Sequence, residues 1–498
     1  MSDESDIETA LARAVELGAE HADARVVRTR TGAMAARDAR LEAAAEDWGV
    51  GLGVRVIVDG CWGFAASDRV TPDEAVRVAE RAVAIARRSR PLTTRRVELA
   101  PEPVHEGHWE SSYELDPFDV PESERIDLIV ERSARLLADP RVAHADARAN
   151  WVREEVRYAD TRGTTTHQTR RRIEAEWSAT VVDAAAGRFE TVATTAPPVA
   201  RGWEYLLGPC PSDGGARPWD WDGELARLPD LVSEKIDAPG IEPGRYALVI
   251  DPTNLWLTIH ESIGHATELD RALGYEANYA GTSFATPDLL GTLRYGSDLM
   301  NVQGDRLAAH GLATVGWDDE GVAAQRWDLI RDGVLVGYQL DRAMAAEMGL
   351  ARSNGCAYAD SGLHVPIQRM PNVSLLPDPA GPATEDLIAS VEDGIYIVGD
   401  RSWSIDMQRY NFQFTGQTFH RIRHGRLVGQ VRDVVYQSRT PDFWGSLVAL
   451  GGPQTYLLGG ALNCGKGQPG QVASVSHGCP SAVFEGINIL NGTREGTS

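Results

Sequence analysis

The sequence predicts an α+β protein: a mixed α/β N-terminal region, residues 1–240, and a mainly antiparallel-β C-terminal domain, residues 241–490, that carries one motif-bearing helix. Three observations predict this class. The 498 residues exceed what one ordinary core accommodates, so two or three domains are expected. Helix-cap signals and alternating polar and apolar runs are interleaved in the first half. Short apolar runs joined by turn dipeptides dominate the second half.

In the N-terminal region, residues 7–17 have helical apolar spacing, and residues 49–66 predict a hairpin that turns at Asp59-Gly60. Thr71, Pro72 and Glu74 supply the cap, first-turn proline and capping box of a helix. A polar connector, residues 91–121, marks where this region could divide into two subdomains. The segments that follow are a helix over 123–139, antiparallel strands over 142–195, a linker over 209–223 and a helix over 224–236.

In the C-terminal domain, Asp332-Gly333, Asp393-Gly394 and His424-Gly425 each lie between apolar runs and predict hairpin turns. Residues 246–250 (YALVI) predict a buried strand. The last residues, 491–498, are expected to form a disordered tail.

Composition excludes several functions. Asp and Glu number 72 against 49 Lys and Arg, a formal charge of -23, and such a surface repels nucleic acid and anionic lipid. The densest basic run, Arg170 to Arg172, is expected to be a solvated strand edge. Neither a signal peptide nor an apolar run of about 18 residues is found. Five cysteines, an odd and sparse set, favour a reducing cytoplasm.

The chemistry is concentrated in one predicted helix. Asp251-Pro252 supplies its cap and first turn, and His260, Glu261 and His265 follow as H-E-x-x-x-H, one residue longer than the H-E-x-x-H of zinc peptidases. Positions five apart on a regular helix point about 140° away from each other, so the two imidazoles could not share an ion. A π-bulge restores the common face, and Gly264 makes it less costly. We therefore predict an irregular turn between the two histidines. The motif alone is equally compatible with two structural histidines on a partly exposed helix.

A catalytic zinc needs a third protein ligand. Cys464, on a glycine-rich turn beside Lys466, is the first candidate, because a nearby cation favours the thiolate. His477 and Cys479 form a second candidate set, and Glu268 is a third option. Glu268 and Asp270 could also orient the imidazoles. The G-x-G-x-x-G spelled by Gly465, Gly467 and Gly470 follows no βαβ pattern, so a dinucleotide-binding oxidoreductase is disfavoured.

Several segments resemble the TldD/PmbA family, and specifically its motif-bearing, TldD-type subunits. The similar segments are GAEHADARV (18–26), HESIGHATELD (260–270), DDEGV (318–322), DGVLVGYQLDR (332–342), NFQF (411–414) and NCGKGQ (463–468). The cysteine loop is one residue shorter than the family's usual C-G-K-x-G-Q, which keeps His477 and Cys479 as alternatives.

The resemblance implies a cytoplasmic metallopeptidase that hydrolyses short or unfolded peptides with loose sequence preference. His260, His265 and Cys464 would bind zinc, or another divalent metal, and Glu261 would be the general base. The partner implied is a motif-lacking TldE/PmbA-type paralogue or a second copy of the chain. Neither nucleic acid nor membrane is expected to bind. Two alternatives remain: a non-catalytic partner subunit, and a metal-dependent hydrolase of non-peptide amides.

Overall fold

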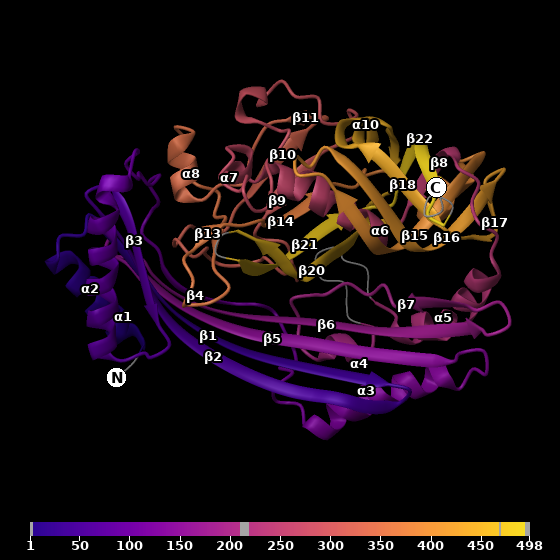
Figure 1. Ribbon diagram of the computed structural model, residues 1–498, viewed down its shortest axis with the longest axis horizontal. Coiled ribbons are helices and arrows are strands. Elements are labelled where there is room, and N and C mark those ends of the chain that lie inside the picture. The colour runs from indigo at the N-terminus through magenta and orange to yellow at the C-terminus, as the bar shows by residue number, and fades with distance from the viewer. Residues whose placement is uncertain (1–2, 210–218, 468–469, 494–498) are drawn as a thin grey trace.

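The computed structural model describes residues 3–209, 219–467 and 470–493. One long, curved sheet dominates the N-terminal half and passes beneath the C-terminal domain (Figure 1). Its strand order is β3-β2-β1-β5-β6-β4, with β7 paired to β6, and all neighbours are antiparallel except β4 and β6. Its strands are β1 (His21–Arg37), β2 (Arg40–Val58), β3 (Cys61–Ser67), β4 (Glu106–Glu110), β5 (His144–Asp160), β6 (Thr165–Asp183) and β7 (Arg188–Ala193).

Two pairs of helices cover one face of this sheet. At one end, alanine and valine side chains of α1 and α2 pack on β1 and β2, and at the other end α3 and α5 pack on a tryptophan-rich core that contains Trp151 and Trp177. The backbone N–H of Glu74 donates to the Thr71 hydroxyl, which confirms the predicted cap of α2. The helices are α1 (Asp3–Glu16), α2 (Pro72–Ser89), α3 (Glu122–Leu137), α4 (Glu204–Leu207) and α5 (Trp221–Asp237).

The opposite face of the sheet is charged, and the C-terminal domain covers it. Arg170 and Arg172 project from β6 onto the carboxylate of Glu154, and Arg172 also donates to Ser474 Oγ of the C-terminal domain at 2.8 Å. Arg171 points to the other side of β6, where Asp116 and Glu110 accept its hydrogen bonds. The prediction that Arg170 to Arg172 form a solvated strand edge is therefore wrong. All three arginines are buried and paired, because strand alternation places two of them in the joint between the domains.

The C-terminal domain is built around a small barrel. Five strands close a ring in the order β15-β8-β22-β18-β16, because β16 pairs back with β15. Only the β8–β15 pair is parallel, so the expected mainly antiparallel domain is confirmed. Outside this ring, β17 pairs with β16, and β19 pairs with β22. The strands are β8 (Gly244–Ile250), β15 (Asp393–Ile405), β16 (Asn411–Arg423), β17 (Arg426–Val431), β18 (Val434–Arg439), β19 (Leu447–Leu450) and β22 (Ala482–Asn491).

Smaller elements are inserted around the barrel. A four-stranded sheet has the order β11-β10-β9-β14, and β12–β13 and β20–β21 form two separate ladders. The strands are β9 (Val302–Asp305), β10 (Arg326–Arg331), β11 (Val334–Leu335), β12 (Ala357–Tyr358), β13 (Ile367–Gln368), β14 (Asn372–Leu375), β20 (Leu457–Lys466) and β21 (Gln471–Cys479). The helices are α6 (Pro252–Ile259), α7 (Leu269–Ala272), α8 (Arg342–Glu347), α9 (Thr384–Ala389) and α10 (Thr440–Gly445).

Three of the four predicted hairpin turns are confirmed. Asp59-Gly60, Asp332-Gly333 and His424-Gly425 each join paired strands, and both residues of each turn have positive φ. Asp393-Gly394 is wrong as a turn, because these residues begin β15 after helix α9. Within the described residues, no helix is long and apolar enough to cross a membrane.

Two predicted loops fall partly outside the described residues. Of the linker predicted over 209–223, residues 210–218 lie outside, and α5 begins at Trp221. Of the tail predicted over 491–498, residues 494–498 lie outside. Asn491 is the buried last residue of β22 and donates to the Ile241 carbonyl.

Candidate metal centre

The motif helix starts at the end of a buried barrel strand. β8 ends at Ile250, and the Asp251 carboxylate accepts the N–H of Thr253 at 3.0 Å and the hydroxyl of Tyr396 at 2.8 Å. Every side chain of α6 is buried. The barrel therefore holds α6 rigidly and delivers the histidines to one defined place.

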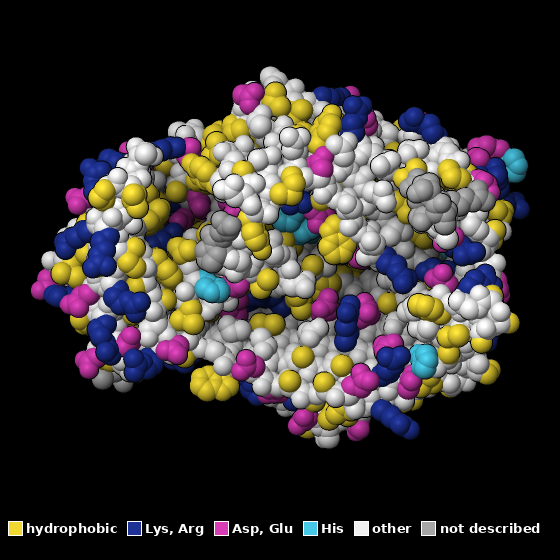
Figure 2. Space-filling model, in the orientation of Figure 1, with side chains coloured by type: hydrophobic (Ala, Val, Ile, Leu, Met, Phe, Trp, Pro, Cys, Tyr) yellow, Lys and Arg dark blue, Asp and Glu magenta, His cyan; other side chains and the backbone are white. Residues whose placement is uncertain are grey.

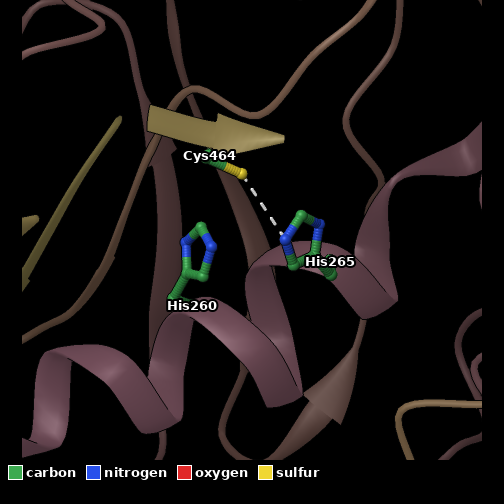
Figure 3. A group of neighbouring side chains, drawn as sticks. All are labelled: His260, His265 and Cys464. Carbon is green, nitrogen blue, oxygen red and sulfur yellow. Dashed lines mark hydrogen bonds between the residues drawn. The ribbon is translucent and has the colours of Figure 1, made fainter. Parts of the chain in front are cut away.

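The backbone changes geometry at the motif, as the five-residue spacing predicts. Residues His260–Gly264 form a π-helical turn in which the N–H of His265 donates to the carbonyl of His260. A 3-10 turn, His265–Thr267, follows. The imidazoles of His260 and His265 consequently lie on one side, with ring centroids 4.6 Å apart (Figure 3). The predicted irregular turn is confirmed.

Two hydrogen bonds in series fix the tautomer of His260. His477 Nδ1 lies 2.9 Å from the Val373 carbonyl, which can only accept, so Nδ1 of His477 carries the proton. Burial holds the pKa of His477 well below its ordinary value, so the ring is neutral and its Nε2 accepts from Nδ1 of His260 at 2.7 Å. The Nε2 lone pair of His260 is thereby left for a ligand.

His265 is oriented by a buried carboxylate. Its Nδ1 lies 3.0 Å from Glu268 Oε2, which leaves Nε2 directed toward Cys464. Burial opposes ionisation of Glu268, but Lys466, His265 and Arg271 outweigh it and hold its pKa well below the ordinary value. The expectation that Glu268 orients an imidazole is confirmed. Asp270 instead accepts from Lys466 Nζ at 2.8 Å.

Cys464 projects from β20 toward the two rings (Figure 3). Its Sγ lies 3.5 Å from His265 Nε2. Burial would raise the pKa of this thiol, but His265 and Arg369 outweigh burial and lower it. The cation that favours the thiolate was expected to be Lys466. That expectation is wrong, because Lys466 Nζ is engaged by Glu268, Asp270 and Gln368.

The three side chains have the composition of a divalent-metal site. Ligand atoms of His260, His265 and Cys464 all lie within 4.8 Å of one another, and the three residues are buried. A zinc ion with bonds of about 2.0–2.3 Å holds its ligand atoms roughly 3.3–3.8 Å apart, so side-chain movements of about 1 Å close this set around one ion. Two neutral imidazoles and a thiol of lowered pKa are the donors that zinc prefers.

The other candidate ligands have different positions. His477 lies behind His260 and Glu268 behind His265, so each contacts a candidate ligand from the side away from Cys464. Cys479 Sγ faces the Pro252 carbonyl at 3.7 Å, and burial holds its pKa well above the ordinary value. The structure therefore brings together the first candidate set and separates Cys479 from it.

Glu261 lies beside the cluster with an arginine partner that the motif did not indicate. Its Oε2 accepts from Arg409 Nη1 at 2.9 Å, and the two side chains are only 8% and 14% exposed. Arg409 comes from the turn between β15 and β16, 148 residues away in the chain. No local pattern in the sequence signals such a contact.

A cleft of about 820 Å³ lies between the N-terminal sheet and the C-terminal domain. The three candidate ligands and Glu261 all line it. Glu174 and Ser178 of β6 line one wall, and Gly459 and Asn463 of β20 line the other. Figure 2 shows the hollow between the two domains, with histidine side chains inside it. A buried His-His-Cys cluster with a carboxylate beside it, at the base of a cleft, is the arrangement expected of a metallohydrolase.

The family follows from two matches. Residues 243–491 match the PmbA/TldA metallopeptidase C-terminal domain, and residues 22–86 match the PmbA/TldA metallopeptidase domain 1. The chain belongs to the PmbA/TldD family of metallopeptidases, as the sequence resemblance predicted.

Curated relatives carry the same description. A metalloprotease of Methanocaldococcus jannaschii is 24% identical over 84% of this chain and 86% of its own length. A metalloprotease TldD homologue of Buchnera aphidicola is 25% identical over 88% of this chain and 86% of its own. A zinc metalloprotease TldD homologue of Saccharolobus solfataricus is 24% identical over 45% of this chain and 47% of its own.

Solved structures share the whole fold. A protein of Thermotoga maritima described as a modulator of a DNA gyrase superposes with a TM-score of 0.76 at 15% identity, covering 98% of this chain and 100% of its own. TldE of Thermococcus kodakarensis superposes with a TM-score of 0.69 at 17% identity, covering 97% and 99%. The mixed N-terminal region and the barrel-containing C-terminal domain are thus a known architecture.

Proposed function

We propose that this protein is a zinc-dependent, H-E-x-x-x-H peptidase that hydrolyses short or unfolded peptides. The observation that carries the proposal is the convergence of His260 Nε2, His265 Nε2 and Cys464 Sγ beside Glu261 at the base of the cleft. These three atoms would hold zinc or another divalent ion. When bound, such an ion lowers the pKa of a water molecule to about 7 and polarises a carbonyl group.

Glu261 is the general base in this proposal. Its carboxylate lines the cleft next to the candidate ligands, so it can accept a proton from the attacking water and deliver it to the leaving amine. Of the two carboxylate oxygens of Glu261, Arg409 donates to Oε2, which leaves Oε1 for the water. The ion pair with Arg409 and the burial of the π-helical turn hold this carboxylate in place.

Loose sequence preference follows from the wall that carries Cys464. β20 pairs only with β21 in the described chain, so its other edge is unpaired, and residues 459–461 and 463–465 of β20 line the cleft. An extended peptide can pair its backbone with such an edge whatever its side chains are. Most strands of a folded protein are already paired within its own sheets, so unfolded peptides are the expected substrates.

The expected partner is a motif-lacking paralogue or a second copy of the chain, in the cytoplasm. The structural similarity to a TldE protein supports a paired arrangement, because the TldE-like fold spans the whole chain. A non-catalytic role for this subunit, or hydrolysis of non-peptide amides, would be the alternative outcome of the following experiment.

The test measures zinc content and cleavage of unstructured peptides by wild type and Glu261→Gln, each with and without a motif-lacking paralogue. We expect about one zinc per chain in both proteins, because Glu261 is not a ligand. Glu261→Gln should lose about three powers of ten in kcat. Retained cleavage in this variant would remove Glu261 as the base. Substoichiometric metal together with no hydrolysis by wild type would favour the non-catalytic alternative, and cleavage of small amides alone would favour an amidase.

A further inference from the structure

An arginine occupies the position next to the proposed general base. Arg409 Nη1 donates to Glu261 Oε2 at 2.9 Å, and Arg409 lines the same cleft as His260, His265 and Cys464. The side chain is 14% exposed and forms part of the cleft lining. No helix or strand contains this residue, which belongs to the turn between β15 and β16.

The turn holds Arg409 in a strained conformation. Its φ is +61°, in the left-handed region that residues other than glycine rarely adopt. Asp406 stabilises the turn, because its carboxylate accepts the N–H groups of Gln408, Tyr410 and Asn411 at 2.8–3.1 Å. The Arg409 carbonyl accepts the hydroxyl of Thr440 at 2.7 Å.

A second segment holds the guanidinium itself. Arg409 Nη2 donates to the Ala280 carbonyl at 3.2 Å, and the backbone of Thr282 donates to Met407 at 2.7 Å. Positive φ also occurs in the hairpin turns of this chain, but here contacts from two other segments hold both the backbone and the guanidinium, as is common for strained residues at active sites. The surrounding turn therefore fixes one cation at the reacting end of the cleft.

We propose that Arg409 is a catalytic residue that donates a hydrogen bond to the scissile carbonyl oxygen as negative charge develops on it. The proposal rests on the peptidase function proposed above. A planar guanidinium with several donors suits this task, because it can contact two anionic groups at once and stays protonated.

The charges balance through the reaction. An O–H bond of the attacking water breaks and its proton moves to Glu261, while the water oxygen bonds to the carbonyl carbon and the C=O π pair moves to the carbonyl oxygen. Arg409 loses its anionic partner as an anionic oxygen forms beside it, and transfers its hydrogen bond to that oxygen. The pair on the anionic oxygen then re-forms the C=O bond as the C–N bond breaks, the nitrogen keeps the C–N pair and takes the proton from Glu261, and the original ion pair of Glu261 and Arg409 re-forms.

The test compares Arg409→Gln and Arg409→Lys with Arg331→Gln, which removes an exposed arginine that pairs with Asp328 in β10, away from the cleft. The readouts are kcat, KM, zinc content and the affinity for a phosphinic peptide, which imitates the tetrahedral, anionic state of the scissile bond. For Arg409→Gln we expect kcat to fall about 10²–10³-fold. The affinity for the phosphinic peptide should fall by a similar factor, with KM and zinc content close to wild type.

Arg409→Lys keeps the positive charge but lacks the planar set of N–H donors, so it should lose at least about tenfold in kcat. This variant keeps the test decisive if the glutamine variant does not fold. Arg331→Gln should match wild type. An increase in KM with unchanged kcat, loss of zinc, or unchanged affinity for the phosphinic peptide would each overturn the role of Arg409. A wild-type protein without zinc and without cleavage would overturn the proposed function instead.

Discussion

At the scale of single residues, the candidate metal centre depends on hydrogen bonds that lie behind the imidazoles. Val373 fixes the proton on His477, and His477 in turn fixes the proton on His260. Glu268 does the same for His265 in one step. Neutral rings with Nε2 lone pairs on one side are therefore a property of the folded chain before any ion binds. Partners of this kind commonly contribute 10–100-fold to metal affinity.

His477→Leu should lower zinc affinity by about 10–100-fold, because Nδ1 of His260 loses its acceptor and the ring can turn or change tautomer. Competition with a chromophoric chelator measures the affinity. His477→Gln, whose amide oxygen can still accept from His260, should recover part of the loss. His420→Leu is the control, because His420 is a half-buried histidine of β16 outside the site. Unchanged affinity in a folded His477→Leu protein would refute this role.

At the scale of elements, the turn that carries Arg409 depends on a close backbone contact. Gly281 has φ of +88°, and a Cβ there would lie 2.1 Å from the Met407 carbonyl oxygen in the turn that carries Arg409. Gly274 has nearly the same φ, +87°, with nothing within 4 Å of its Cβ position. Substitutions at these two glycines therefore distinguish the cost of a positive φ from the cost of a close backbone contact.

Gly274→Ala should cost about 1–2 kcal/mol of unfolding free energy from positive φ alone, with activity unchanged. Gly281→Ala adds a collision with backbone, so it should cost more and also lower kcat, because the turn that holds Arg409 must move. Denaturant unfolding and peptide cleavage measure the two effects. Equal behaviour of both variants in both assays would show that this contact does not position the turn.

The elements also show how far sequence reasoning reaches. The π-helical turn could be predicted, because two histidines five residues apart cannot share a face of a regular helix. Arg409 could not, since its contact with Glu261 joins segments 148 residues apart through a turn of unusual φ. Asp393-Gly394 has the composition of a hairpin turn, but tertiary pairing with β8 and β16 makes it the start of a strand.

At the scale of the whole molecule, buried ion pairs join the N-terminal sheet to the C-terminal domain. Arg25 pairs with Asp319 at 2.5 Å, and Arg55 pairs with Glu320 at 2.8 Å. In the same joint, Glu154 pairs with Arg170 and Arg172 of the N-terminal sheet and accepts the hydroxyl of Tyr358 of the C-terminal domain at 3.2 Å. A polar, alternating strand pattern looks the same in sequence whether water or a second domain covers it, which is why the burial of these arginines was not predicted.

This joint should make stability depend on pH. Burial opposes ionisation of Glu154, but Arg170 and Arg172 outweigh it and lower its pKa to about 2. The unfolded chain takes up this proton near pH 4.3, so the stabilisation is present above about pH 4.3 and is lost as pH falls toward 2. The difference between the pKa of Glu154 in the unfolded and the folded chain corresponds to about 3 kcal/mol of unfolding free energy.

Glu154→Gln should lower the unfolding free energy at pH 7 by about 3–5 kcal/mol, because it leaves two buried arginines without their carboxylate. The difference from wild type should then shrink as the pH falls from about 4.5 to about 2.5. Urea unfolding across this range measures both effects, and Glu42→Gln, at an exposed position of β2, is the control. A difference that stays constant with pH would contradict the assignment.

The central claim is that His260, His265 and Cys464 bind one metal ion, and zinc K-edge X-ray absorption tests it most directly. On the zinc-loaded protein we predict one sulfur near about 2.3 Å and nitrogen or oxygen ligands near about 2.0 Å, with the sulfur lost in Cys464→Ala. A zinc shell without sulfur in the wild-type protein, or a sulfur that persists in Cys464→Ala, would contradict the account.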